Sequence, residues 1–195
     1  MPYLILIAAY LLGSLPFGYI LTKMSRKTDI RKYGSGNIGA TNVLRVFGWR
    51  AALPVFILDL AKGLIAVLLA KAVSDIMAIY LLAGFLAMFG HSFPIYLRFK
   101  GGKAVATSIG VLSALSGWVT LIVIVCFLLI LYFTRYVSLG SITSMLVLPL
   151  LFWLLGFGLP YILFGIAAAL LVIVRHHENI GRLLKGTESK FGKKG

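Results

Sequence analysis

Cysteine and acidic residues are scarce in this chain. Its 195 residues include one cysteine, Cys126, and only five Asp or Glu residues against 19 Lys or Arg, which gives a net charge of +14. A single cysteine excludes an intramolecular disulfide and a cysteine-based metal site. The three aspartates, at positions 29, 59 and 75, are dispersed along the chain, which disfavours an enzyme that holds metal ions on an aspartate cluster.

The chain also lacks a polar block of domain size. Hydrophobic residues make up 61% of the sequence, and the mean hydropathy is +1.01; both values exceed those of soluble domains. Apolar stretches recur along the whole length, so residues 1–195 are predicted to form a single membrane-embedded domain.

Seven apolar stretches are candidates for membrane spans, which need about 20 residues each. They are residues 2–22, 51–70, 76–97, 104–117, 118–134, 137–155 and 159–174. The fourth is short enough to be tilted or partly re-entrant. In the first, Gly13, Ser14, Pro16 and Gly18 predict a kinked, closely packed helix. Because the apolar runs are continuous rather than alternating, the predicted fold is all-α, a polytopic membrane protein with seven transmembrane helices.

Basic residues fall almost entirely on one side of this topology. Seventeen of the 19 lie in loops or in the tail on one face: Lys23, Arg26, Lys27, Arg31, Lys32, Arg45, Arg50, Arg98, Lys100, Lys103, Arg135, Arg175, Arg182, Lys185, Lys190, Lys193 and Lys194. The positive-inside rule then places the N-terminus outside and the C-terminus in the cytoplasm. Anionic membrane lipids are sufficient partners for the tail lysines. No nucleic acid is expected to bind, because no recognition module or aromatic-interleaved basic stripe is present.

The first loop carries the motif GSGNIGATNVLR. Gly34, Gly36 and Gly39 match G-x-G-x-x-G, but the dinucleotide fingerprint needs a preceding strand, whereas this loop follows a membrane helix. A P-loop needs Lys before Thr41, where this chain has alanine. The glycines still allow backbone N–H groups to converge on an anion, among neutral donors from Ser35, Asn37, Thr41 and Asn42. Arg45 adds a bidentate phosphate contact; a flexible glycine linker is the alternative interpretation.

The second loop carries similar residues in FKGGKAVAT. Lys100, Gly101, Gly102 and Lys103 lead directly into the fourth stretch, where a helix N-terminus favours an anion. This pattern predicts a second phosphate site, and a charged helix boundary is the alternative. His91, upstream in the third stretch, is interpreted as a packed helix residue rather than a ligand.

The tail motif HHENIGRLLKGTE begins where the last apolar stretch ends. On a continuing helix, His176 and Asn179 share a face with Arg182 and Leu183. An imidazole at this position can act as a base or as a hydrogen-bond donor, whereas interfacial solvation is the alternative, more so for His177.

Asp59 and Lys62 are the only obvious opposite charges at intramembrane depth, three residues apart in the second stretch. An isolated charge there costs several kcal/mol, so such groups pair or line a polar cavity. A structural pair and a scaffold for an active site are both compatible with the sequence.

Taken in order, LLGSLPFGYI, GSGNIGATNVLR, HSFPIYLRFKGGKAVAT, RYVSLGS and HHENIGRLLKGTE resemble motifs of the bacterial acyl-phosphate-dependent glycerol-3-phosphate acyltransferases, over nearly the whole chain. Ala104 departs from the glycine expected in many relatives. The resemblance implies transfer of a fatty acyl group from acyl phosphate to the 1-hydroxyl of glycerol 3-phosphate, giving lysophosphatidate and inorganic phosphate, the first acylation of bacterial phospholipid synthesis. It implies a multi-pass protein of the bacterial cell (inner) membrane with a cytoplasmic active site, and no metal, nucleotide or other cofactor.

The resemblance also implies roles for individual residues. The acyl-phosphate group is assigned to Gly34, Gly36, Asn37, Gly39, Thr41, Asn42, Gly101 and Gly102, with Ser141 of the SLGS turn as a further substrate contact. Glycerol 3-phosphate and the transition state are assigned to Ser35, Arg45, Lys103, His176 and Asn179. Because acyl phosphate is an activated anhydride, direct attack by the glycerol hydroxyl is expected, with phosphate positioning and charge neutralisation accelerating it. The proton acceptor is either His176 or a substrate phosphate.

Two competing functions fit the sequence less well. No histidine is followed by Asp five positions later, which excludes acyltransferases with an H-x-x-x-x-D signature. A small transporter or flippase for an anionic metabolite is the alternative from another class, but it predicts polar residues at the bilayer midplane and repeated halves. Here the polar motifs lie at one interface. The sequence leaves the oligomeric state open and is compatible with a monomer.

Overall fold

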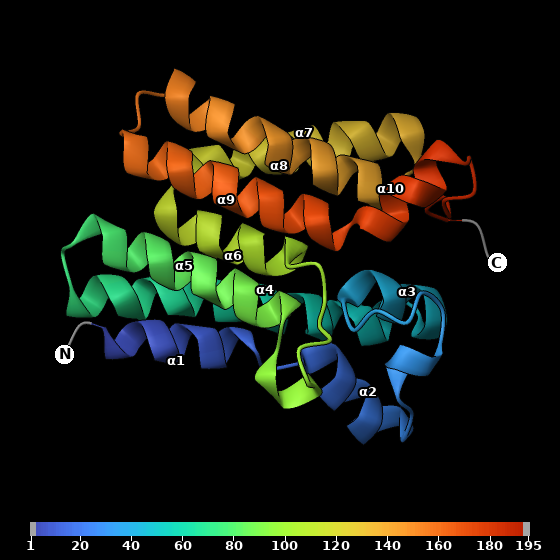
Figure 1. Ribbon diagram of the computed structural model, residues 1–195. Helices are drawn as coiled ribbons and strands as arrows, with labels where there is room; N and C mark the ends of the chain where they lie inside the picture. Colours follow the sequence, from blue (N-terminus) through green and yellow to red (C-terminus); the bar gives the residue numbers. More distant parts are fainter. Residues whose placement is uncertain (1–2, 193–195) are drawn as a thin grey trace. The chain divides into compact units, whose positions relative to one another are not determined.

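The computed structural model describes residues 3–192, and all regular secondary structure in this range is helical (Figure 1). The all-α prediction is therefore confirmed for the described residues. The predicted cytoplasmic Lys193 and Lys194, and residue 2 at the start of the first predicted span, lie outside them. The chain divides into two compact units, with the boundary between Ala114 and Leu115, and each unit is described separately.

The first unit contains α1 (Leu4–Gly13), α2 (Phe17–Arg26), η1 (Ile30–Lys32), α3 (Ala40–Phe47), α4 (Trp49–Val73), α5 (Met77–Ser92), η2 (Ile95–Leu97) and most of α6 (Val105–Leu115). The second contains α7 (Gly117–Thr134), α8 (Val137–Leu154), α9 (Leu159–Arg175) and α10 (His177–Leu184). The sequence did not predict α3, which the left-handed Gly48 (φ +80°) joins to α4.

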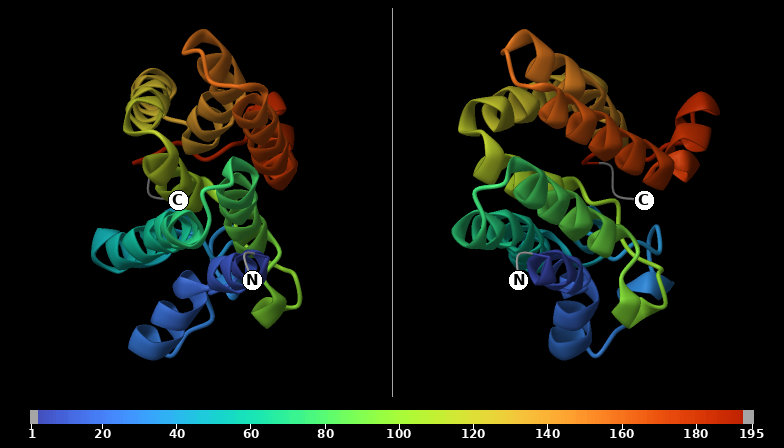
Figure 2. Two further views of the ribbon diagram at one scale, coloured as in Figure 1. Left: turned by 90° about the vertical axis from the view of Figure 1, so that its left-hand side faces the viewer. Right: turned by 60° about the vertical axis from the view of Figure 1, so that its left-hand side comes forward.

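In the first unit, α1, α4 and α5 pack side by side, as both views of Figure 2 show. Their contact is made by small buried residues, among them Ala9, Ala66, Ala83 and Ala87. Gly13 lies so close to the backbone of Ala87 that a Cβ atom would overlap it. Small residues let membrane helices approach closely, and the dispersion attraction of this close packing replaces the hydrophobic driving force that lipid does not supply.

The predicted kink of the first segment is confirmed. Between α1 and α2 the chain bends by 41°, around Leu15 and Pro16. Proline has no N–H to donate, and the bend leaves carbonyl groups without helical partners. The ammonium group of Lys62, from α4, donates to the carbonyl of Leu15 at 2.9 Å, and Gly18 allows α2 to approach the carbonyl of Ile38. The break is therefore satisfied from within the protein.

The fourth predicted span is the short helix α6. Its 11 residues extend for only about 16 Å at 1.5 Å per residue, less than a bilayer core of about 30 Å. Gly110 packs directly on the backbone of Leu60 in α4. The ammonium group of Lys71 donates to the carbonyl of Ala114 at 2.5 Å, which satisfies an acceptor in the last turn of α6 and complements its dipole.

Four helical segments in the described residues are long and apolar enough to cross a membrane: Trp49–Val73, Met77–Leu97, Gly117–Thr134 and Val137–Leu154. Counting each bent pair, Leu4–Gly13 with Phe17–Arg26 and Leu159–Arg175 with His177–Leu184, as one span gives up to six. The chain thus has the helices of a multi-pass membrane protein. Seven spans, the orientation of the termini and a single domain stay predictions.

The second unit is an up-and-down arrangement in which α7 packs on α8 and α8 on α9. Gly140 faces the ring and carbonyl of Phe127, and Gly165 faces Pro149 and Phe152. The face that His176 and Asn179 would share on a continuing helix is not formed, because the chain turns by 63° between α9 and α10. His176 lies at this turn and precedes α10.

The Lys71 contact predicts a measurable loss of stability. Lys71→Met keeps the length of the side chain but leaves the carbonyl of Ala114 without its donor, so we expect a loss of about 1.5 kcal/mol. Thermal unfolding in detergent measures this as a lower midpoint for the variant than for wild type. An unchanged midpoint would show that the bond contributes nothing to folding.

Candidate active site

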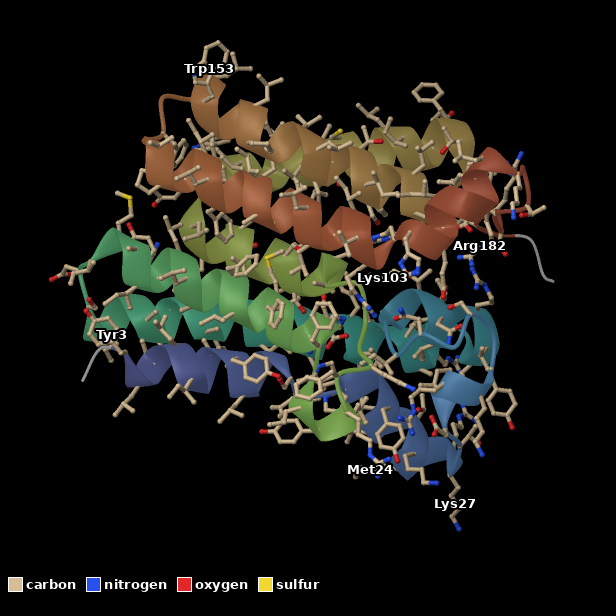
Figure 3. All side chains as sticks on the ribbon, in the orientation of Figure 1. Tyr3, Met24, Lys27, Lys103, Trp153 and Arg182 are labelled. Carbon is tan, nitrogen blue, oxygen red and sulfur yellow. The ribbon has the colours of Figure 1, made fainter. Side chains whose placement is uncertain are left out.

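The two glycine-containing loops of the first unit share one hydrophobic cluster. Ile30, Ile38 and Val43 come from the first loop and α3, and Leu97 from the second loop; all are buried together with two residues of α4. The antiparallel neighbours α4 and α5 begin and end, respectively, at these loops. Figure 3 shows Lys103 at this end of the unit and Tyr3 at the other. Two of the three predicted motifs therefore converge.

The first loop begins with a locked ion pair. The carboxylate of Asp29 accepts the backbone N–H of Arg31 at 3.0 Å and its guanidinium at 2.7 Å. The hydrogen bond from the Arg31 side chain is the main reason why the pKa of Asp29 falls from 3.8 to about 2. The same guanidinium lies over the ring of Tyr19, 4.8 Å from its centroid. The guanidinium of Arg31 therefore stabilises the structure of the first loop.

Asn42 organises the glycine turns. Its side chain is 2% exposed; its oxygen accepts the N–H of Ser35 at 2.8 Å, and its nitrogen donates to the carbonyls of Tyr33 at 3.0 Å and Asn37 at 2.8 Å. Gly34 has φ +60° and lies where a Cβ atom would overlap the Asn42 oxygen. Only glycine adopts such a turn without cost. The structure therefore contradicts a flexible linker.

The N-terminal turn of α3 provides free donors. The side chain of Asn37 accepts the N–H of Gly39 at 2.8 Å, whereas the N–H groups of Ala40 and Thr41 have no hydrogen-bond acceptor among residues 3–192. Such orphan donors and the helix dipole favour an anion. Arg45, one turn further along α3, is exposed and has no ion pair within the described residues. Ser35 is also exposed.

An apolar groove starts at the same turn. It has a volume of about 280 Å³ and is lined by Ala40, Thr41, Leu44, Trp49, Ala52, Leu53 and Phe56, from α3 and the first part of α4. All but one of these side chains are hydrophobic. The groove is thus apolar, and its lining includes the two residues whose N–H groups have no acceptor among the described residues.

The second loop packs on the end of α5. A Cβ atom on Gly101 would overlap the carbonyl of His91, and one on Gly102 would overlap the ring of His91. The N–H of Gly102 donates to the carbonyl of His91 at 3.0 Å, so this group is used by the fold rather than held for a ligand. Lys103 is half-buried. Ala104 is left-handed, with φ +59°, a conformation that glycine adopts more readily than alanine.

Asp59 and Lys62, which the sequence predicts either to pair or to line a polar cavity, form an ion pair. The ammonium group of Lys62 lies 2.8 Å from the carboxylate of Asp59. His91, interpreted from the sequence as a packed residue, is 4% exposed, and its Nδ1 lies 3.5 Å from the same carboxylate oxygen. These three residues lie in the first unit, and the ring of His91 lies against Gly102 of the second loop.

In the second unit, His176 is 3% exposed and its Nδ1 lies 2.7 Å from the carbonyl of Val172. A carbonyl only accepts, so Nδ1 carries the proton of this hydrogen bond. In the neutral ring Nε2 is then the basic nitrogen, which is the form that a proton acceptor needs. His177 is exposed and makes a similar contact with Val174 at 2.9 Å.

Asn179 is held by a residue that the sequence did not identify. Its nitrogen donates to the carboxylate of Glu188 at 2.6 Å, and that carboxylate also accepts from Ser138 and from the Arg182 guanidinium, each at 2.7 Å. Burial would raise the pKa of Glu188, but these three hydrogen bonds hold it below 4.5. The only sequence signal for this contact is the position of Glu188 as the last residue of the tail motif.

Ser141 lies in the first turns of α8, so the prediction that SLGS forms a loop turn was wrong. Its hydroxyl donates to the carbonyl of Val137 at 2.9 Å. Through Ser138 and Glu188, Asn179 is tied to this same end of α8. That Ser141, His176 and Asn179 act in one site with the loops of the first unit stays a prediction.

Comparison with known proteins gives a consistent result. The family model for glycerol-3-phosphate acyltransferase matches residues 3–186. A glycerol-3-phosphate acyltransferase of Thermoanaerobacter pseudethanolicus is 47% identical, with 96% of this chain and 94% of the relative covered. One from Prochlorococcus marinus is 51% identical, with 96% of each covered.

Two crystal structures are similar over nearly the whole chain. Both are of PlsY, an integral membrane glycerol 3-phosphate acyltransferase. Its glycerol 3-phosphate form has a TM-score of 0.94 at 41% identity and covers 98% of this chain and 96% of PlsY. Its lysophosphatidic acid form has a TM-score of 0.91 at 40% identity and covers 98% and 95%.

Removing the side-chain amide of Asn42 is expected to loosen the first loop. Asn42→Ala deletes four hydrogen bonds of about 1 kcal/mol each. Trypsin should therefore cleave after Lys32 and Arg45 at least tenfold faster, as measured by mass spectrometry of timed digests. Tyr33→Phe keeps the Tyr33 carbonyl that Asn42 uses and is the matched control. Equal cleavage rates in wild type and Asn42→Ala would contradict this role.

The tail contact is expected to depend on pH. Because the folded pKa of Glu188 lies below its ordinary value of 4.5, the carboxylate stabilises the tail fully above that value, and the stabilisation is lost as the pH falls through the folded pKa. Hydrogen exchange of the 183–192 peptide, corrected for its intrinsic pH dependence, should show protection at pH 6 that disappears in acid. Glu188→Gln should lack most of this protection at pH 6; full protection in that variant would refute the charge dependence.

Proposed function

Because the chain belongs to the glycerol-3-phosphate acyltransferase family, we propose that it transfers a fatty acyl group from acyl phosphate to the 1-hydroxyl of glycerol 3-phosphate. The products are lysophosphatidate and inorganic phosphate. The similar PlsY structures, in their glycerol 3-phosphate and lysophosphatidic acid forms, support this acceptor and this product. The motifs of the sequence support the donor.

One observation carries the proposal for this chain. The lining of the apolar groove between α3 and α4 includes Ala40 and Thr41, whose N–H groups have no acceptor among the described residues. An acyl phosphate has the matching form, a hydrocarbon chain that ends in a phosphorylated carbonyl. We place its chain in the groove and its phosphate at the start of α3, where the helix dipole and Arg45 stabilise the anion.

The reaction needs no covalent intermediate on the enzyme. The glycerol oxygen attacks the acyl carbon, a C–O ester bond forms, and the bond from the acyl carbon to the phosphate oxygen breaks, so that phosphate leaves with the electron pair. The hydroxyl proton goes to Nε2 of His176 or to the departing phosphate. Cations that neutralise the phosphates lower the barrier, since the leaving group gains negative charge in the transition state.

The chain's own residues divide this work. We assign charge neutralisation to Arg45 and Lys103 and contact with the glycerol 3-phosphate to Ser35 and Asn179. Asn42 acts through the loop, because its amide is bound to the backbone. Gly101 and Gly102 act by allowing the second loop to approach α5. Gly34, Gly36, Asn37, Gly39, Thr41 and Ser141 complete the proposed substrate site.

We further propose one domain with seven spans, an external N-terminus and a cytoplasmic C-terminus, in the bacterial inner membrane. The asymmetric distribution of Lys and Arg supports this orientation. It puts the polar loops in the cytoplasm, where the water-soluble glycerol 3-phosphate can reach them.

The decisive experiment uses purified protein in detergent with acyl phosphate and labelled glycerol 3-phosphate. We expect labelled lysophosphatidate and inorganic phosphate in equal amounts, and no product when a thioester replaces acyl phosphate. A transporter needs a sealed compartment and would give no product. Absence of product from well-folded protein refutes the proposal.

Arg45→Ala and Lys103→Ala test the site assignment in the same assay. Removal of one cation that stabilises the transition state is expected to lower kcat/KM by roughly 100-fold or more, with the unfolding midpoint unchanged. Arg50→Ala is the matched control, because Arg50 is exposed, lies over the ring of Trp49 and has no ion pair within the described residues. Full activity of the first two variants would remove both residues from the site.

A further inference from the structure

A group of three buried polar side chains, Lys62, Asp59 and His91, lies in the interior of the first unit. Lys62 and Asp59 of α4 are each 2% exposed, and His91 of α5 is 4% exposed. The Lys62 ammonium lies 2.8 Å from the Asp59 carboxylate, and Nδ1 of His91 lies 3.5 Å from the same carboxylate oxygen. Charged groups at such positions are costly and mark function more often than they add stability.

Lys62, at one end of this group, stabilises the bend between α1 and α2. The Lys62 ammonium donates to the carbonyl of Leu15 at 2.9 Å and lies 5.7 Å from the centre of the Phe17 ring. A neutral donor would satisfy the same carbonyl, so the bend alone does not require an ion pair.

His91, at the other end of the group, contacts the second loop. The imidazole of His91 lies directly beneath Gly102, because a Cβ atom added there would overlap Nε2 and approach two ring carbons. The Gly102 N–H donates to the His91 carbonyl at 3.0 Å, and Gly101 packs on the carbonyls of His91 and Ser92. The backbone that precedes Lys103 therefore rests on this ring.

We propose that His91 is a positioning residue for the phosphate-binding turn. The Asp59–Lys62 pair fixes the orientation of the imidazole, and the ring fixes the position of the backbone at Gly101 and Gly102. This turn then directs Lys103 toward the phosphate of glycerol 3-phosphate. The inference rests on the proposed function. It differs from a purely structural role because it predicts that changing His91 impairs handling of the phosphorylated substrate in protein of unchanged stability.

Two variants test the proposal. His91→Phe keeps a ring under Gly102 but removes Nδ1, and the double variant Asp59→Asn with Lys62→Met removes both charges at similar volume. In each, KM for glycerol 3-phosphate should rise about tenfold and kcat should change less. The unfolding midpoint should stay near wild type in His91→Phe and fall in the double variant, because Lys62→Met also leaves the carbonyl of Leu15 without its donor. Combining all three changes should add no further loss, since the groups act in series.

Lys71→Met is the matched control, because it also removes a cation of α4 that is bound to a carbonyl. It should lower the unfolding midpoint and leave KM unchanged. Wild-type KM in both His91→Phe and the neutral double variant, or a KM loss that follows the unfolding midpoint across all the variants, overturns the proposal. If wild type itself makes no lysophosphatidate, the proposed function fails instead.

A suppressor pair gives an answer even if a buried-charge variant does not fold. Gly102→Ala places a methyl group against the imidazole and should raise KM at least tenfold. Adding His91→Ala makes room for that methyl group and should recover threefold or more of the loss. If the second change worsens KM or leaves it unchanged, the ring does not set the position of the turn.

Discussion

Lipid offers no hydrogen-bond partner to a broken helix, so every break within this chain must be satisfied by the protein itself. The first unit does this with three side chains. Lys62 donates to the carbonyl of Leu15 at the bend, Lys71 to that of Ala114 near the end of α6, and the hydroxyl of Tyr10 to that of Phe93 after α5, at 2.9 Å. The breaks matter because the loops depend on them: Phe93 begins the second loop, and the first loop follows α2.

The first loop, at the polar end of the first unit, is stabilised by hydrogen bonds from a neutral side chain. A single amide, that of Asn42, joins the backbone at Tyr33, Ser35 and Asn37, so the loop needs no ligand to hold its shape. Preorganised donors cost little reorganisation when an anion binds. Arg31 is neutralised by Asp29, whereas Arg45 has no such partner in residues 3–192, which separates a structural arginine from one available to substrate.

The sequence predicted what depends on local composition. Continuous apolar runs identified the membrane helices, Pro16 with neighbouring glycines identified the bend, and the spacing of Asp59 and Lys62 identified their pair. The order of the motifs identified the family. The first three features are each encoded within a short segment. The structure confirmed the bend and the ion pair, the comparisons confirmed the family, and four to six of the seven predicted spans have matching helices among the described residues.

What the sequence missed depends on contacts between distant segments. Helix α3 has only eight residues, and its stability comes from packing on α4 rather than from its own propensity. Glu188 owes its role to Ser138, 50 positions earlier, and the turn at His176 has no proline or glycine to mark it. The contact of His91 with Gly102 joins α5 to the next loop, and no spacing rule describes it.

Ala104 illustrates how an unfavourable backbone can persist. Its left-handed φ of +59° costs an alanine roughly 1 kcal/mol relative to glycine. Its methyl group is 1% exposed, and alanine also leaves the unfolded chain fewer conformations than glycine would. These two effects offset the torsional penalty, so the choice between the two smallest residues at this position is close to neutral for folding.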